Sequence, residues 1–126
     1  MKKEVFAIAL LGALIAVSVL NIGGIVRLTD ELTETVELAS AAAENENWDS
    51  AEIQAEKAIA SWKAKDSYTH IVLRHSEIDT LSDALYDFLN DIMDKNVGAA
   101  EASSQKVIYH LESISQMERL RLGSIF

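Results

Sequence analysis

Residues 70–79, HIVLRHSEID, hold the densest group of side chains in this sequence that could do chemistry. Within ten positions they contain His70, Arg74, His75, Glu77 and Asp79. On a helix, His75 and Asp79 are four positions apart and can touch, as can His70 and Arg74. Imidazole and carboxylate groups at such spacing fit a metal or acid-base site, a contact with a partner, or a polar seam between helices.

A metal or catalytic site has the weakest support. Zinc takes three or four protein ligands, and one helix turn offers His75 and Asp79. If the last two helices fold back on each other, His110 lies about 13 Å along the axis from the level of His75, so a third ligand is missing. Ser76 points about 100° away from His75, and the chain has no G-x-S-x-G motif. We therefore predict no catalytic residue, no metal, no cofactor and no enzymatic activity.

A stripe of aspartates follows the same segment. Asp79, Asp83, Asp87 and Asp91 are each four positions apart, so a helix places them on one face. Like charges at this spacing destabilise a helix by a few tenths of a kcal/mol per pair. A solvated outer face is one interpretation, and an acidic surface of Asp83, Asp87 and Asp91 for a cation or a basic partner is the other.

The composition favours helices as the elements that position these side chains. The 126 residues include no proline and five glycines, so the chain lacks the turn residues on which all-β folds depend. The chain contains no cysteine, which excludes disulfides and thiolate metal sites. We predict an all-α fold.

Hydrophobic periodicity divides residues 28–126 into four helical segments, 28–44, 49–65, 67–95 and 99–121. The third segment has apolar residues at heptad spacing: Ile71, Ile78, Leu85 and Ile92, with Leu81 and Phe88 between them. In the last segment we expect Val107, Ile108, Leu111, Ile114 and Met117 to face inward. Because the connections are short, we predict an antiparallel four-helix up-down bundle. Trp48 and Trp62 share one stripe with small alanines, which indicates close helix packing.

An apolar run, VFAIALLGALIAVSVLNIGGIV, covers residues 5–26. As a helix it would reach about 33 Å, which is enough to cross the roughly 30 Å core of a bilayer. A cleaved signal peptide is the alternative, but the run is longer than a usual signal-peptide core. We predict a single-pass transmembrane anchor over residues 1–27 and a separate helical domain over residues 28–126. The pair Gly12 and Ala16 is compatible with helix association in the membrane, and so with a homo-oligomer.

The charges on either side of this run set its orientation. Lys2 and Lys3 precede it, whereas Arg27 is followed by Asp30 and Glu31. The positive-inside rule then places the N-terminus in the cytoplasm and residues 28–126 outside the cell membrane. Those residues contain eight basic and nineteen acidic side chains, a net charge of −11. A surface of this charge repels nucleic acid and anionic lipid headgroups.

Within such a bundle, we interpret residues 70–79 as a polar seam between helices. Arg74 takes a core position of the heptad, and His75, Glu77 and Asp79 surround it. The fold-back geometry places Arg119 and Arg121 near Glu77, and Lys57 near His75. A half-buried cluster of this kind would fix the register of the helices. Arg74, His75, Glu77 and Asp79, with Trp62, are therefore the predicted seam, or else a contact with a partner.

Four features together resemble the domain of unknown function family 4363. They are the N-terminal apolar segment, Trp62, the sequence HSEID at 75–79 and the C-terminal LRLGSIF. The sharpest is H-x-E-I-D, whereas the family's usual ending, L-x-x-N-I-F, is changed at Ser124. The resemblance spans nearly the whole chain and implies a small membrane-anchored protein of bacteria, mainly Firmicutes. Members are often encoded beside polytopic membrane proteins, which implies an accessory role.

These observations favour a non-catalytic interaction or accessory subunit that binds another membrane protein. The alternative is an extracytoplasmic sensor bundle for a small ligand or cation. About four residues precede the apolar run, so a sensor would have to signal through a partner.

Overall fold

The computed structural model describes the backbone of residues 2–65, 69 and 73–125, and the side chains of the same residues except 18–23 and 121–125. All regular elements within these residues are helices, which confirms the all-α prediction for this part of the chain. The described helices are α1 (Lys2–Glu44), α2 (Trp48–Ala64), α4 (His75–Met93) and α5 (Val97–Ile125).

Two of these bounds differ from the sequence-based expectation by more than two residues. Helix α4 begins at His75 rather than at residue 67, and residues 66–68 and 70–72 lie outside the described residues. The backbone at Arg74 is extended, with φ −69° and ψ 143°, and this conformation ends the helical path on the N-terminal side. Helix α5 continues to Ile125 rather than ending near residue 121. As expected, α1 runs without a break past Arg27.

Asparagine caps follow the turn between α1 and α2 and the turn between α4 and α5. The Asn47 side chain accepts a hydrogen bond from the Ser50 amide at 3.5 Å, and the Asn96 side chain accepts one from the Ala99 amide at 3.1 Å. Each cap follows a residue in the left-handed region, Glu46 with φ 57° and Lys95 with φ 54°. Each asparagine therefore satisfies one of the free amides at the start of the next helix.

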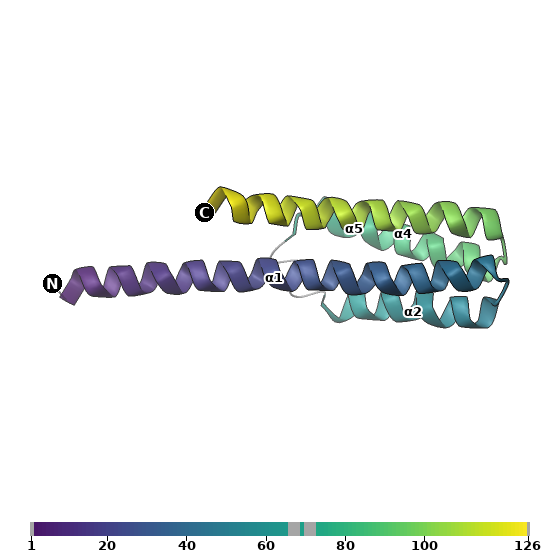
Figure 1. The fold of residues 1–126 in the computed structure, drawn as a ribbon, viewed down its shortest axis with the longest axis horizontal. Coiled ribbons are helices and arrows are strands. Elements are labelled where there is room, and N and C mark those ends of the chain that lie inside the picture. Colours follow the sequence, from purple (N-terminus) through teal and green to yellow (C-terminus); the bar gives the residue numbers. More distant parts are fainter. Residues whose placement is uncertain (1, 66–68, 70–72, 126) are drawn as a thin grey trace.

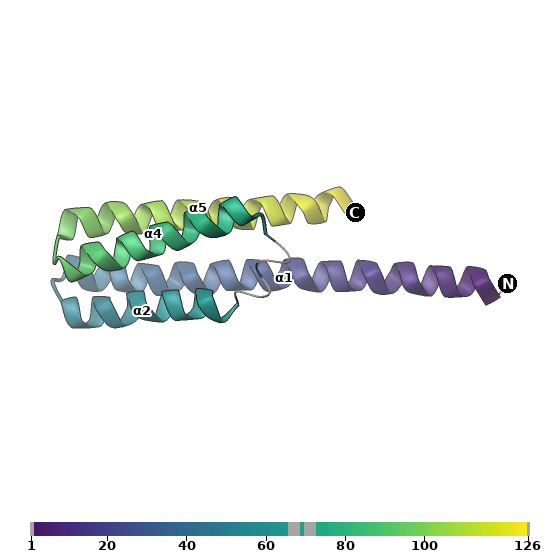
Figure 2. The same cartoon turned by 180° about the vertical axis from the view of Figure 1, so that it is seen from behind.

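The helices pack side by side as a helical bundle (Figures 1 and 2). Helix α1 packs against α2 and α5, and α4 packs against the same two helices. Successive helices run in opposite directions along the bundle (Figure 1). The chain ends at the end of the bundle from which the N-terminal half of α1 projects (Figure 1).

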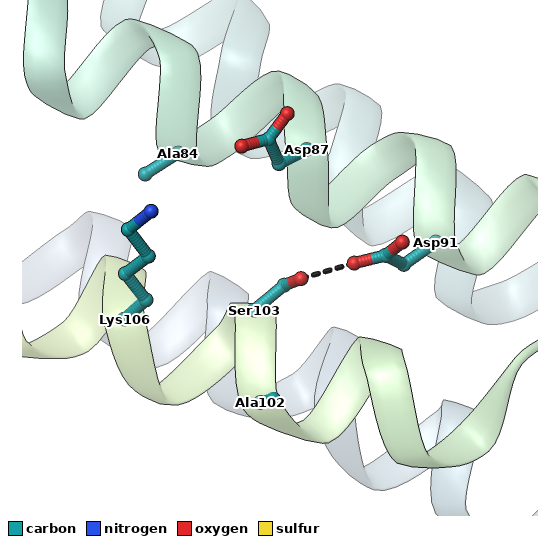
Figure 3. A pocket seen from close by; sticks show the side chains of 6 residues that line it. All are labelled: Ala84, Asp87, Asp91, Ala102, Ser103 and Lys106. Atoms are coloured by element: carbon teal, nitrogen blue, oxygen red, sulfur yellow. Dashed lines mark hydrogen bonds between the residues drawn. The ribbon is translucent and has the colours of Figure 1, made fainter.

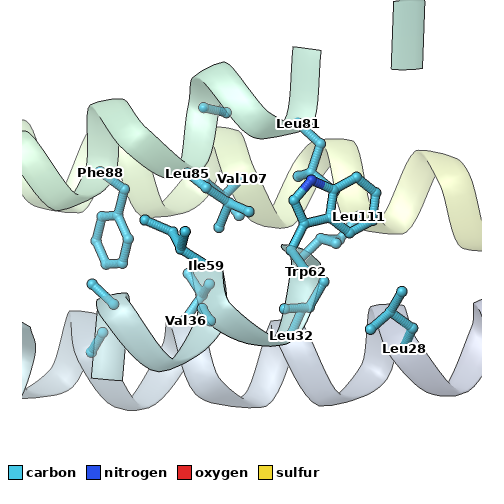
Figure 4. Close-up of a cluster of buried hydrophobic side chains, with 14 of the residues drawn as sticks. Leu28, Leu32, Val36, Ile59, Trp62, Leu81, Leu85, Phe88, Val107 and Leu111 are labelled. Atoms are coloured by element: carbon cyan, nitrogen blue, oxygen red, sulfur yellow. The ribbon is translucent and has the colours of Figure 1, made fainter. Parts of the chain in front are cut away.

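The core runs along the bundle axis and receives side chains from all four described helices (Figure 4). Phe88, Leu81 and Leu85 of α4 are at most 1% exposed. The predicted heptad positions of α4 are buried throughout its described length: Ile78, Leu81, Leu85, Phe88 and Ile92. Ile71 lies outside the described residues. Burial of this apolar surface is the main stabilising contribution to the fold.

Small residues bring α1 close to its neighbours. Ala55 and Ala58 of α2 are buried, as are Ala39 of α1 and Ala100 of α5. Between α1 and α5, the hydroxyls of Ser40 and Ser104 form a hydrogen bond of 3.2 Å. Larger side chains at these positions would force the helices apart.

The N-terminal part of α1 extends beyond the rest of the bundle (Figure 1). Its apolar side chains are exposed as far as residue 17, with Phe6 and Ile8 each 71% exposed. Farther along the same helix, the Ile25 side chain is fully buried. Within the described part of the chain, no helical stretch combines the length and the apolar character that a membrane crossing requires.

Candidate functional site

The HSEID segment forms the first turn of α4. Arg74 is the N-cap residue, has no side-chain capping bond and is exposed. His75 Nε2 lies 3.8 Å from a carboxylate oxygen of Asp79, and the two side chains are 76% and 65% exposed. This pair therefore lies on the bundle surface, where an ion pair contributes little to stability. His70 lies outside the described residues.

Glu77 is the half-buried member of the predicted seam. It is an acidic residue in the first turn of α4, where its charge is favourable beside the free amides of the helix N-terminus. The expected neighbour Lys57 lies elsewhere, because it lines a pocket between α1 and α2 together with Glu34 and Leu38. Helices α2 and α4 are antiparallel, and the hydrogen bond between Trp62 and Ser82 sets their register. In this register Lys57 lies about three helical turns along the bundle from His75.

Trp62 connects α2 to α4. Its indole Nε1 donates a hydrogen bond of 2.9 Å to the Ser82 hydroxyl, and the residue is 5% exposed. The ring packs in the core beside Leu32 and Leu81 (Figure 4). A buried indole N–H without an acceptor would be costly, so Ser82 satisfies the one polar group of this side chain. Ser82 was not among the predicted residues.

The aspartate stripe is divided between two environments. Asp83 and Asp87 are exposed, whereas Asp91 is half-buried and its carboxylate accepts a hydrogen bond from the Ser103 hydroxyl of α5. Asp87, Asp91 and Ser103 line a pocket of about 260 Å³ between α4 and α5, together with Lys106 (Figure 3). The stripe is thus partly a polar contact between helices, which the spacing of four residues alone does not reveal.

The α4–α5 pocket combines two carboxylates with one ammonium and one hydroxyl group (Figure 3). Such a set can form hydrogen bonds and ionic contacts with a polar ligand or a partner side chain. Across the described residues, no group of three or more histidine, aspartate and glutamate side chains could hold a metal ion.

The inward face of α5 differs from the expectation at its C-terminal end. Met117 is 39% exposed, and the adjacent Glu118 is 2% exposed. The buried residues Val107, Leu111 and Ile114 advance by four and three positions, and the next step of the helical repeat is Glu118. Met117 was predicted to face inward because it is apolar, and this prediction was wrong, since the helix geometry places Glu118 there.

Comparisons with known proteins identify one family. The model of the family described as "Domain of unknown function (DUF4363)" matches residues 19–125. No curated protein matches the chain. No solved structure matches it either.

Proposed function

The chain belongs to the DUF4363 family, and from that premise we propose that it is a membrane-anchored accessory subunit without catalytic activity. Residues 1–27 form a single-pass anchor, and residues 28–126 form an up-and-down four-helix domain. The domain binds another membrane protein. The chain takes no cofactor. It binds no nucleic acid, because its net charge of −9 opposes binding to phosphate backbones.

The observation that carries this proposal is the apolar surface of the projecting part of α1. Val5, Phe6, Leu11 and Leu14 are all more than half exposed, far from the core of the bundle. A soluble protein rarely exposes a continuous apolar surface of this kind. The apolar run in the sequence covers residues 5–26. The structure describes the side chains of this run except those of residues 18–23.

The orientation rests on flanking charge. Lys2 and Lys3 precede the apolar run, and Arg27 follows it. The excess of basic residues on the N-terminal side favours a cytoplasmic N-terminus. The domain of residues 28–126 then lies outside the cell membrane, where it can meet the extracytoplasmic parts of a partner.

Exposed apolar side chains on the bundle support binding to a partner protein. Leu38 on α1 is 54% exposed, and Ile53 on α2 is 63% exposed. Leu38 lines the pocket between α1 and α2 together with Lys57, and Ile53 lies four positions before Lys57 on α2, so both residues belong to the α1–α2 side of the bundle. Apolar side chains surrounded by polar ones are typical of a surface that a partner covers.

One observation favours the sensor alternative. The pocket between α4 and α5 gathers Asp87, Asp91 and Lys106 around a volume of about 260 Å³ (Figure 3). A small ligand with both a positive and a negative group would complement it. The signal would then pass through the partner.

Two double variants test the proposal. Leu11→Arg with Leu14→Arg places two charges in the apolar run, and we expect this variant to leave the membrane fraction after an alkaline wash that wild type survives. Leu38→Arg with Ile53→Arg should stay in the membrane fraction but lose cross-links to its partner. Release of wild type by the wash would refute anchoring, and unchanged cross-links in the second variant would refute the α1–α2 side as the contact.

A further inference from the structure

Basic side chains gather at the end of the bundle from which the apolar part of α1 projects. Arg27 lies on α1, Lys65 caps the C-terminus of α2, Arg74 precedes α4, and Arg119 lies near the end of α5. All four are exposed. They come from four separate segments, which lie together at the end of the bundle from which α1 projects (Figures 1 and 2). We call these four residues the basic collar.

Contacts between helices place these residues at similar heights along the bundle. Asp91 of α4 bonds to Ser103 of α5, and this bond sets the register of the two antiparallel helices. In this register Arg119 lies at the level of His75, the first residue of α4, which directly follows Arg74. Arg27 and Lys65 line one pocket of about 230 Å³. Glu31 also lines that pocket, so its two cations face one carboxylate.

The opposite end of the bundle has fewer basic residues among the described side chains. Its exposed side chains at the two turns include Glu44, Glu46, Asp49 and Asp94, with Lys95 as the basic exception among those described. From Arg27 to Glu44, α1 rises about 25 Å at 1.5 Å per residue. This distance exceeds two Debye lengths at physiological salt, so the acidic end would scarcely affect an anionic surface that touches the collar.

We propose that the basic collar binds the phosphate groups of anionic phospholipids at the membrane surface. This inference rests on the proposed function, because it takes the apolar part of α1 to be embedded in a bilayer. Arg27 directly follows the apolar run, so the collar lies at the height of the lipid headgroups. The inference holds for either orientation, since the collar adjoins the end of the run in both.

The physical basis is the attraction of lysine and arginine to an anionic surface, worth roughly a fivefold factor in affinity for each residue. Arginine can also hold a phosphate through two hydrogen bonds. Lys63 is left out of the collar because its ammonium lies 5.0 Å from the centre of the Tyr86 ring. The collar modifies the expectation from net charge, because an acidic chain can still present four exposed basic side chains to the membrane. The exposed carboxylates at the same end are Asp30, Glu31 and Asp79 among the described residues.

The test uses the full chain reconstituted into vesicles of phosphatidylcholine and phosphatidylglycerol in equal amounts. The chain is then extracted into mild detergent, and its retained lipids are counted by mass spectrometry. We expect wild type to retain phosphatidylglycerol at least fivefold over phosphatidylcholine. The variant Lys65→Gln, Arg74→Gln, Arg119→Gln should retain the two lipids within twofold of each other. Arg27 stays unchanged in this variant because it flanks the apolar run itself.

The control variant is Lys57→Gln, Lys95→Gln, Lys106→Gln, which removes three exposed basic residues outside the collar and changes the net charge equally. It should keep the wild-type preference. The lipid proposal would be overturned, with anchoring intact, if both variants lost the preference for phosphatidylglycerol equally. It would also be overturned if stably incorporated wild type showed no such preference. Failure of wild type to incorporate into vesicles would overturn both. Loss of the preference on adding inorganic phosphate, but not chloride of equal ionic strength, would assign the collar to free phosphate and also overturn the lipid proposal.

Discussion

At the scale of single residues, some polar side chains of this bundle join neighbouring helices. Trp62 and Ser82 join α2 to α4, Ser40 and Ser104 join α1 to α5, and Asp91 bonds to α5. Each bond satisfies a polar group at or near the core, where an unpaired group would destabilise the fold. These bonds also fix how far one helix can slide along its neighbour.

The Trp62–Ser82 hydrogen bond gives a direct prediction. Trp62→Phe removes the indole N–H and should lower the free energy of unfolding by about 1–2 kcal/mol, since a lost hydrogen bond costs about 1 kcal/mol and some apolar contact is lost as well. Ser82→Ala should cost about 1 kcal/mol. The coupling energy between Trp62 and Ser82 is measured by urea unfolding, in detergent, of both single variants and of the double variant. Strict additivity would contradict a bond between the two residues.

Glu77 distinguishes two accounts of the HSEID segment. As a half-buried residue in the first turn of α4, it interacts with the helix N-terminus, so Glu77→Gln should lower the free energy of unfolding by about 0.3–1 kcal/mol. Breaking a buried ion pair would cost about 3–5 kcal/mol. Urea unfolding decides between these values. A loss of 3 kcal/mol or more would restore the ion-paired seam that the sequence predicted.

Residue patterns predicted the core better than the polar contacts. The apolar repeat of Ile78, Leu85 and Ile92 identified the buried face of α4, because burial of large apolar side chains follows directly from helical spacing. Ser82 and Ser103 escaped notice because serine is common on helix surfaces, and its partner comes from another helix. The buried Glu118 was missed because its charge outweighed its position in the repeat.

At the scale of elements, helix existence followed from the sequence more reliably than helix ends. Local polar chemistry marks the start of α2, where the Asn47 side chain caps the helix. The start of α4 at His75 was predicted wrongly, because the apolar heptad positions continue on both sides of Arg74, at Ile71 and Ile78, and conceal the extended backbone at Arg74. Register between helices depends on contacts such as Trp62–Ser82, which explains why Lys57 was placed wrongly.

Small residues on α2 set the distance between helices, and this can be tested. Ala55 is 1% exposed, so Ala55→Leu should force neighbouring helices apart and lower the free energy of unfolding by about 1–3 kcal/mol. Ala60 lies on the exposed side of the same helix, and Ala60→Leu should change the free energy of unfolding by less than about 0.5 kcal/mol. Thermal unfolding followed by circular dichroism compares them. Equal stability of the two variants would contradict close packing at Ala55.

At the scale of the whole molecule, one helix joins two environments. The buried half of α1 supplies Leu28, Leu32 and Val36 to the core, while the other half exposes its apolar side chains. A continuous helix of this kind would hold the bundle at a fixed height above a bilayer, with the basic collar next to it and the acidic turns farthest away. Composition predicted the acidic character of the chain, but only the packing of four segments brings the collar residues together.

The central claim is that α1 anchors an extracytoplasmic bundle, and cysteine labelling tests it most directly because the chain has no cysteine of its own. A membrane-impermeant maleimide is applied to intact bacterial cells that produce Gln105→Cys or Glu4→Cys, both at exposed positions. We predict that Gln105→Cys is labelled in intact cells and that Glu4→Cys is labelled only after permeabilisation. Labelling of Glu4→Cys but not Gln105→Cys in intact cells would contradict the orientation, and recovery of both variants in the soluble fraction would contradict the anchor itself.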